Sequence, residues 1–315
     1  MDRVKTYLVQ GFLDGGKTTY IQEQIFGGYF HKRGSTLIIS FEEGMTEYDV
    51  GKLREYRTEI AVYAGEEDVA DFCRAALKRV RPDRVYVEMN VMMEGLREKL
   101  PDCLESVFTV TLIDGTTLPL YYDNMRQLLQ DMLKSSHMAI INRCEDREAL
   151  AVYGVPFRLM NPRCDYLRQS AMGYSEKAFG RMLPYDLSES ALEIGEEEYP
   201  VFHLDSHENP ENYDGKSISF DAQVRSREDI PADSVWIGRS VMTCCMQDIQ
   251  FLGFECSAAD GVPAELSDGS WVHIRAEARL TRDRYNAPRL CLALQSVRPV
   301  SSPAQSIIGL TQRQA

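Results

Sequence analysis

Residues 11–18 read GFLDGGKT and fit the pattern G-x-x-x-x-G-K-S/T at every fixed position. In such a segment the glycines let backbone N–H groups turn inward around phosphate oxygens, and the lysine neutralises phosphate charge. The preceding residues 4–10 are apolar enough for a buried strand, and Ile21 and Ile25 lie four apart, as on one face of a helix. A strand, a glycine loop and a helix in this order predict a phosphate-binding loop.

The loop assigns a contact to each of its polar residues. Lys17 is expected to reach the β- and γ-phosphates, and the hydroxyl of Thr18 is expected to bind Mg²⁺. The positive N-terminal end of the following helix points at the same phosphates. The residues expected to contact the nucleotide here are Gly11, Asp14, Gly15, Gly16, Lys17, Thr18 and Thr19.

The first half of the chain alternates between apolar strands and amphipathic helices. Further strands are expected at 35–41, 84–89, 108–114 and 137–142, and helices at 69–80 and 120–132. Strands that alternate with helices form a parallel sheet covered on both faces. The fold class is therefore α/β, a P-loop NTPase sheet with flanking helices.

The pattern changes near residue 185, where an acidic stretch and then a turn-rich stretch occur. Beyond them, five short strands separated by turns predict a small all-β, barrel-like domain. The expected organisation is a P-loop domain at 1–185, a linker at 186–215, the β domain at 216–301 and a tail at 302–315.

Carboxylates at strand ends supply the acidic group that a phosphate loop needs. Glu88 and Asp114 each end a predicted strand, and the carboxyl ends of parallel strands line the ligand crevice. With Lys17 they form the candidate catalytic set, in which Glu88 or Asp114 orients magnesium or water. The alternative for each is a solvated carboxylate. Glu42 and Glu43 belong either to a loop that senses the γ-phosphate or to an ordinary acidic turn.

Residues 142–145 are expected to distinguish guanine from adenine. They follow the fifth predicted strand and read N-R-C-E. A carboxylate three residues after the asparagine can accept from the guanine N1–H and 2-amino groups, which adenine does not offer in that arrangement. Asn142 and Glu145 are the expected guanine readers, with Asp146 as an adjacent substitute for Glu145.

Overall charge and apolar patterning restrict the partners. The net charge is −13 and the pI about 5.0, which argues against binding nucleic-acid phosphates. No apolar run approaches the eighteen or so residues of a membrane helix, and the N-terminus lacks a signal-peptide pattern. We therefore expect a cytoplasmic protein without membrane insertion, whose eight cysteines stay reduced.

The first half resembles the CobW/UreG/HypB group of metal-linked GTPases over residues 4–180. The resemblance is carried by GFLDGGKTT, FEEG, VYVEMN, TLID, INRCED and Asn161-Pro162, in that order. It implies that Lys17 and Thr18 hold phosphate and magnesium, that Glu88 opens an E-x-x-G segment, and that Asn142 reads guanine. Val91 replaces the glycine of that segment, which is expected to alter the γ-phosphate contact or slow hydrolysis. The C-x-C-C metal motif and the usual C-terminal domain of CobW relatives are not recognisable.

Residues 216–301 resemble the C-terminal domain of YcgR-like proteins, which accompany a putative permease. Gly238-Arg239, Thr243-Cys244-Cys245, FLG and SDGSWVHI carry this resemblance. It implies a GTP-binding protein that acts with a membrane permease, or with a metalloprotein client, in metal or small-solute homeostasis.

Two further groups are candidate metal ligands. Cys244 and Cys245 can bind a soft ion such as Zn²⁺, but neighbouring strand residues face opposite ways, so the alternative is one cysteine in the core. The H-x-D-x-H segment at 203–207 is either a metal site or a solvated turn.

The combined prediction is slow, Mg²⁺-dependent GTP hydrolysis. The alternatives are a nucleotide or metal sensor that does not hydrolyse, and a P-loop ATPase or kinase.

Overall fold

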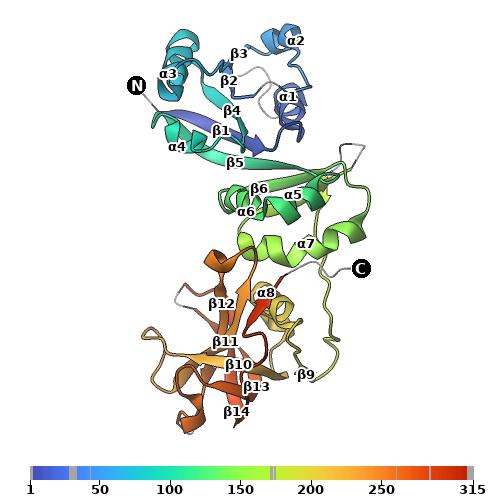
Figure 1. Ribbon diagram of the computed structural model, residues 1–315, viewed down its shortest axis with the longest axis vertical. Helices are drawn as coiled ribbons and strands as arrows, with labels where there is room; N and C mark the ends of the chain where they lie inside the picture. Colours follow the sequence, from blue (N-terminus) through green and yellow to red (C-terminus); the bar gives the residue numbers. More distant parts are fainter. Residues whose placement is uncertain are drawn as a thin grey trace. The chain divides into compact units, whose positions relative to one another are not determined.

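The structure is a computed structural model, and it divides into two compact units, Met1–Gly180 and Arg181–Ala315 (Figure 1). It describes residues 3–27, 34–42, 44–170, 173, 175–259, 261–283 and 285–310. Glu43 therefore lies outside the described residues.

The N-terminal unit is built on an eight-stranded sheet in the order β3-β2-β4-β1-β5-β6-β7-β8. All neighbouring pairs are parallel except β7 and β8, so the predicted α/β class is confirmed. The strands are β1 (Val4–Gly11), β2 (Thr36–Ser40), β3 (Thr58–Val62), β4 (Arg84–Asn90), β5 (Leu104–Asp114), β6 (Met138–Asn142), β7 (Asp165–Gln169) and β8 (Ser175–Lys177). The helices are α1 (Lys17–Gly27), α2 (Val50–Glu55), α3 (Val69–Val80), α4 (Leu96–Lys99), α5 (Leu118–Asn124), α6 (Arg126–Lys134) and α7 (Arg147–Met160).

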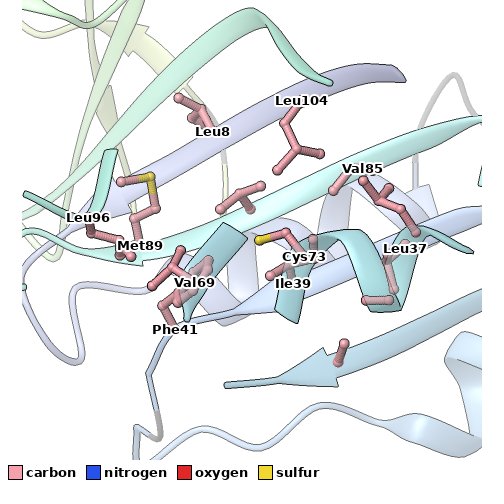
Figure 2. Close-up of a cluster of buried hydrophobic side chains, with 14 residues drawn as sticks. Leu8, Leu37, Ile39, Phe41, Val69, Cys73, Val85, Met89, Leu96 and Leu104 are labelled. Atoms are coloured by element: carbon pink, nitrogen blue, oxygen red, sulfur yellow. The ribbon is translucent and has the colours of Figure 1, made fainter. Parts of the chain in front are cut away.

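Both faces of this sheet are buried, which explains the continuous apolar runs of its central strands. On one face Leu8, Ile39 and Val85 pack against Cys73 of α3 (Figure 2). On the other face Ile21 of α1 packs in a second cluster with Val9, Ile38 and Tyr86. A fully buried aliphatic side chain contributes roughly 1.5–3 kcal/mol relative to an exposed one. The strands that carry the nucleotide loop are therefore anchored from both sides.

Local signals set the ends of α3. The side chain of Asp68 accepts hydrogen bonds from the backbone N–H groups of Ala70 and Asp71, which have no partner inside the helix. Arg81 adopts a left-handed conformation (φ 50°) at the other end, directly before Pro82, which cannot continue the helix. The helix thus ends where the proline predicts.

The C-terminal unit contains a seven-stranded sheet in the order β15-β11-β12-β14-β13-β10-β9. An additional pairing of β10 with β11 closes a ring of five strands, as in a small barrel. The strands are β9 (Ala191–Glu193), β10 (Ser217–Arg225), β11 (Ser234–Met242), β12 (Gln250–Ser257), β13 (Trp271–Arg282), β14 (Pro288–Pro299) and β15 (Ile307–Gly309). The helices are α8 (Tyr199–Glu208) and the 3-10 turns η1 (Pro210–Asn212), η2 (Met246–Asp248) and η3 (Ala264–Leu266).

Two glycines face each other across β11 and β12. Gly238 is the register partner of Gly253. A Cβ on Gly238 would lie 2.0 Å from the Leu252 carbonyl oxygen, and one on Gly253 would lie 2.3 Å from Trp236 Nε1. The strands can approach this closely only where side chains are absent.

The structure differs from the predicted borders of the second half. The segment expected to be a linker, 186–215, contains β9, α8 and η1, and the expected tail contains β15. Tyr199, Phe202 and Leu204 of α8 are buried, so the helix belongs to the core of this unit despite its acidic, turn-rich surroundings. None of the helices within the described residues is long and apolar enough to cross a membrane.

Candidate functional site

The glycine loop connects the end of β1 to the start of α1, in the centre of the parallel sheet. Gly16 has φ +94°, and a Cβ there would lie 2.6 Å from Asn142 Nδ2. A Cβ on Gly11 would lie 2.5 Å from the Leu112 carbonyl oxygen. Glycine is therefore required at both positions by geometry, and at Gly16 also by backbone conformation.

Lys17 is folded back into the loop with 1% of its surface exposed. Its ammonium donates to the carbonyl oxygens of Phe12 (2.6 Å) and Gly11 (3.3 Å). It also forms an ion pair with Glu42, with 2.9 Å between Nζ and Oε1. The charge predicted to meet a phosphate is thus held by an internal carboxylate directly after β2.

The hydrogen bonding of Glu42, the partner of Lys17, is incomplete. Burial raises the pKa of this carboxyl, and nearby Lys17 opposes the shift. The second carboxylate oxygen, Oε2, is buried without a hydrogen-bond partner among the described residues. A buried oxygen without a donor costs roughly 1–3 kcal/mol, so the contact can be exchanged for a better one.

Thr18 and Glu88 meet in the interior. The Thr18 hydroxyl donates to Glu88 Oε1 at 2.7 Å, and Glu88 is 1% exposed on β4. The other carboxylate oxygen accepts from Ser40 Oγ at 2.6 Å and from the Tyr48 hydroxyl at 2.9 Å. Burial, followed by the charge of Glu88, raises the pKa of Tyr48, which keeps its hydroxyl protonated as a donor. Three hydroxyls therefore hold one buried carboxylate.

The segment after β2 is tied to the loop at two further points. Asp14 Oδ1 accepts from the Met45 N–H at 2.9 Å, and Gln22 Oε1 accepts from the Asp49 N–H at 2.8 Å. Together with Tyr48, these contacts fasten residues 44–49 over the loop and α1.

Asp114 lies in a different set of contacts. Its carboxylate accepts from Arg143 Nη1 at 2.5 Å and from the Thr116 N–H and hydroxyl at 2.8 and 2.6 Å. Burial alone would raise the pKa of Asp114, but the bonds from Thr116 and Arg143 prevail and lower it. The structure thus brings Glu88, but not Asp114, to Thr18 within the described contacts.

Asn142 links the expected base segment to the phosphate loop. Its Nδ2 donates to the Gly15 carbonyl at 2.9 Å, while its Oδ1 is buried without a partner among the described residues. Glu145 is exposed, whereas Asp146 accepts from Glu148 N and Ala149 N as the N-cap of α7. One carboxylate oxygen of Asp146, Oδ1, is therefore used to cap α7.

Several contacts at the site carried no signal in the sequence. Nothing in the sequence spacing of Ser40 and Tyr48 indicates that they meet Glu88. Phe12 stacks on Tyr121 with ring centroids 3.7 Å apart, which links the loop to α5. Thr19 is exposed in the first turn of α1.

Both candidate metal-binding groups contain residues that make hydrogen bonds within the C-terminal unit. Cys244 and Cys245 are half-buried beside η2, where Asp248 Oδ1 accepts from the Cys245 N–H at 3.1 Å. Asp205 is buried in α8 and accepts from Arg181 and Tyr213. Among the described residues, no group of three or more His, Cys, Asp or Glu side chains is placed to hold a metal ion.

Comparisons with known proteins add one sequence match and several distant structural neighbours. Residues 170–308 match the DUF1980 C-terminal domain, so the YcgR-like expectation for this region is not confirmed. No curated protein matches the chain.

The structure is similar to HypB from Archaeoglobus fulgidus, with 15% identity, a TM-score of 0.38, and coverage of 54% of this chain and 82% of that one. It is similar to a Zn(II)-bound triple mutant of the YjiA GTPase, with 16% identity, a TM-score of 0.39, and coverage of 71% and 74%. It is also similar to nickel-bound HypB from Helicobacter pylori, with 13% identity, a TM-score of 0.36, and coverage of 54% and 80%. At this similarity the neighbours assign no role to individual residues of the chain.

Proposed function

We propose that the N-terminal unit binds GTP with Mg²⁺ and hydrolyses it slowly. The observation that carries the proposal is the position of Lys17, buried inside a glycine loop next to the Thr18–Glu88 pair. A buried ammonium and a hydroxyl–carboxylate pair at the start of a helix are the groups that phosphate and magnesium require.

The residues present fit a magnesium ion. Magnesium takes oxygen ligands, and hydroxyl and carboxylate oxygens of Thr18 and Glu88 lie 2.7 Å apart in the same buried place. Thr18 would hold the ion directly, and Glu88 would hold it or its water. When bound, magnesium neutralises charge on the transferred phosphate.

Lys17 would exchange one anion for another. A γ-phosphate that takes the Lys17 ammonium must displace Glu42, whose contact leaves one oxygen without a partner among the described residues. The released Glu42 would carry the segment 44–49 with it, so nucleotide state is read by this segment.

Two observations support slow turnover. The Val91 N–H, at the position of the missing glycine, donates to the Gly11 carbonyl at 3.2 Å and is not directed at a nucleotide in this conformation. Arg143 Nη1 donates to the Asp14 carbonyl of the loop at 2.9 Å and is paired with Asp114, and the described contacts place no arginine on Lys17, Thr18 or Glu88. An arginine at the transferred phosphate accelerates hydrolysis by orders of magnitude.

Guanine preference would come from Glu145, with Asn142 holding the segment against the loop. The wider role, which rests on resemblance in sequence, is metal or small-solute homeostasis in the cytoplasm beside a membrane permease or a metalloprotein client. Among the described residues Cys244 and Cys245 lack the further ligands that a zinc site requires, so Zn²⁺ is not part of this proposal.

Calorimetric titration of the full chain with GDP and with ADP, in magnesium, tests the proposal. We expect GDP binding without ADP binding, loss of GDP binding in Lys17→Ala, and no change in Lys5→Ala, which alters an exposed lysine of β1. Equal binding of both nucleotides would support an ATPase or kinase. Binding of neither would refute the nucleotide site.

A sensor that binds GTP without hydrolysing it is the second candidate, favoured by the Val91 contact. Phosphate release measured with excess GTP separates the two. Release above the level of Glu88→Gln supports hydrolysis, and equal release supports the sensor.

A further inference from the structure

The C-terminal unit contains a pocket of about 260 Å³, lined by residues of β9, β10, β11, β13 and β14 and of the segments beside them. Ionisable side chains of both signs line it: Glu193, Glu196, Asp221, Arg239, His273 and Arg298. All of them belong to residues 193–303, so the pocket is separate from the nucleotide loop of the other unit. Its volume lies near the lower end for small-molecule sites, which suits a ligand of metabolite size.

Arg239 is the anchor of the pocket. It lies on β11 and is 2% exposed. Its Nη2 donates to Glu196 Oε1 at 2.6 Å and to the Gln305 carbonyl at 3.3 Å, and the guanidinium lies 5.1 Å from the centre of the Trp271 ring. Arginine cannot lose its proton in a protein, so this position keeps a buried positive charge.

One N–H donor of the Arg239 guanidinium is not used: Nε is buried and has no hydrogen-bond partner among the described residues. Nε and Nη2 form one edge of the guanidinium, and that edge matches the two oxygens of a carboxylate. Glu196 occupies only half of this edge, and 42% of its side chain is exposed, whereas 3% of Arg239 is. Glu196 can therefore turn into solvent while Arg239 stays in place.

Arg298 supplies a second positive charge to the pocket lining, next to His273. His273 is hydrogen-bonded through Nδ1 to Asp221 Oδ1 at 2.7 Å, which leaves Nε2 for another partner. Arg298 of β14 is the register partner of His273, and it is exposed. Three carboxylates also line the space, and two of them are already engaged, Glu196 by Arg239 and Asp221 by His273.

We propose that this pocket binds a small dicarboxylate. One carboxylate pairs with the Nε–Nη2 edge of Arg239 in exchange for Glu196. The other lies beside Arg298 and His273. The ligand thereby completes the hydrogen bonding of Arg239, which the chain alone leaves incomplete among the described residues.

Titration of the full chain with succinate, followed by NMR, tests the proposal. Succinate should shift resonances of the pocket, and its neutral isostere succinamide should not. Glu196→Gln, which removes the competing charge, should tighten succinate binding about threefold to tenfold, whereas Arg298→Gln should weaken it by a similar factor. Arg282→Gln alters an exposed arginine outside the pocket lining and should change nothing.

Arg239→Lys should weaken succinate binding at least tenfold, because an ammonium cannot make the two parallel bonds. If that variant does not fold, the succinate affinities of Glu196→Gln and Arg298→Gln test the proposal without it. Equal binding of succinamide, or succinate binding unaffected by both variants, would overturn the proposal. So would loss of succinate binding in Lys17→Ala, because the phosphate loop would then be the anion site.

Discussion

The ammonium of Lys17 and the carboxylate of Glu42 lie 2.9 Å apart, and both side chains are almost fully buried. The residue that should bind phosphate therefore already holds an anion from its own chain. Since burial disfavours the charge of Glu42 and leaves its Oε2 without a described partner, this pair is a competitor for phosphate rather than a strong anchor.

Glu42→Gln should tighten the binding of a non-hydrolysable GTP analogue. The neutral amide no longer competes for the Lys17 charge, and we expect a threefold to tenfold lower Kd, or about 0.6–1.4 kcal/mol. Calorimetry in magnesium measures the change. Glu47→Gln is the matched control, because Glu47 lies in the same segment with its side chain exposed. Weaker binding of the GTP analogue in Glu42→Gln would show that Glu42 supports the bound state.

Glu145→Gln should change base selectivity. The carboxylate accepts from guanine N1–H and the 2-amino group, whereas the amide also offers a donor, which suits the C2 carbonyl of xanthine. We expect the ratio of GDP to XDP affinity to fall at least tenfold, measured by competition at constant magnesium. Asp146→Asn should leave the ratio unchanged, since Asp146 caps α7. A shift in the control but not in Glu145→Gln would move the base reader to Asp146.

The central strands were predictable because both of their faces are buried. β1, β4, β5 and β6 produce apolar runs that leave few other interpretations. β3 was not predicted, because it is a five-residue strand at the sheet edge whose burial follows no regular period, so its short apolar stretch gives no clear strand pattern. α8 was also missed, since its buried aromatic residues are interrupted by Asp205 and by acidic and turn-forming neighbours.

The site was predictable only in part, for the same reason. The loop motif has a fixed spacing along the chain, so Lys17 and Thr18 could be found. The strand-end position indicated Glu88 and Asp114 equally, and only the folded structure joins Thr18 to Glu88 and Arg143 to Asp114. The Tyr48 contact depends on how residues 44–49 return over the sheet, which no local pattern encodes.

Asp205 should stabilise the C-terminal unit rather than hold a metal. It is 3% exposed, accepts from Arg181 Nε and Nη2 at 2.8 Å each, and accepts from the Tyr213 hydroxyl at 2.6 Å. Asp205→Asn breaks the paired bonds and should lower the free energy of unfolding by about 2–3 kcal/mol in urea titrations. Glu277→Gln, from an exposed pair with Arg279, should change it by less than about 0.5 kcal/mol. Unaltered stability of Asp205→Asn would contradict this role.

His203 should make the C-terminal unit less stable in mild acid. Burial, and then the neighbouring His207, hold the pKa of His203 well below its usual value. Below about pH 6.5 the unfolded chain binds a proton at this histidine that the folded chain does not bind, so the free energy of unfolding decreases as the pH falls. A single proton of this kind gives a slope of up to about 1.4 kcal/mol per pH unit.

His203→Phe removes that proton and keeps an aromatic ring beside Phe254, whose ring centroid lies 5.1 Å from that of His203. The free energy of unfolding of this variant, measured in urea between pH 7 and 5, should therefore depend less steeply on pH than that of the wild type. The two should converge toward pH 7, where the unfolded histidine is mostly neutral. Parallel curves would mean that His203 takes up its proton equally in the folded and unfolded chains, and that burial in α8 does not suppress it.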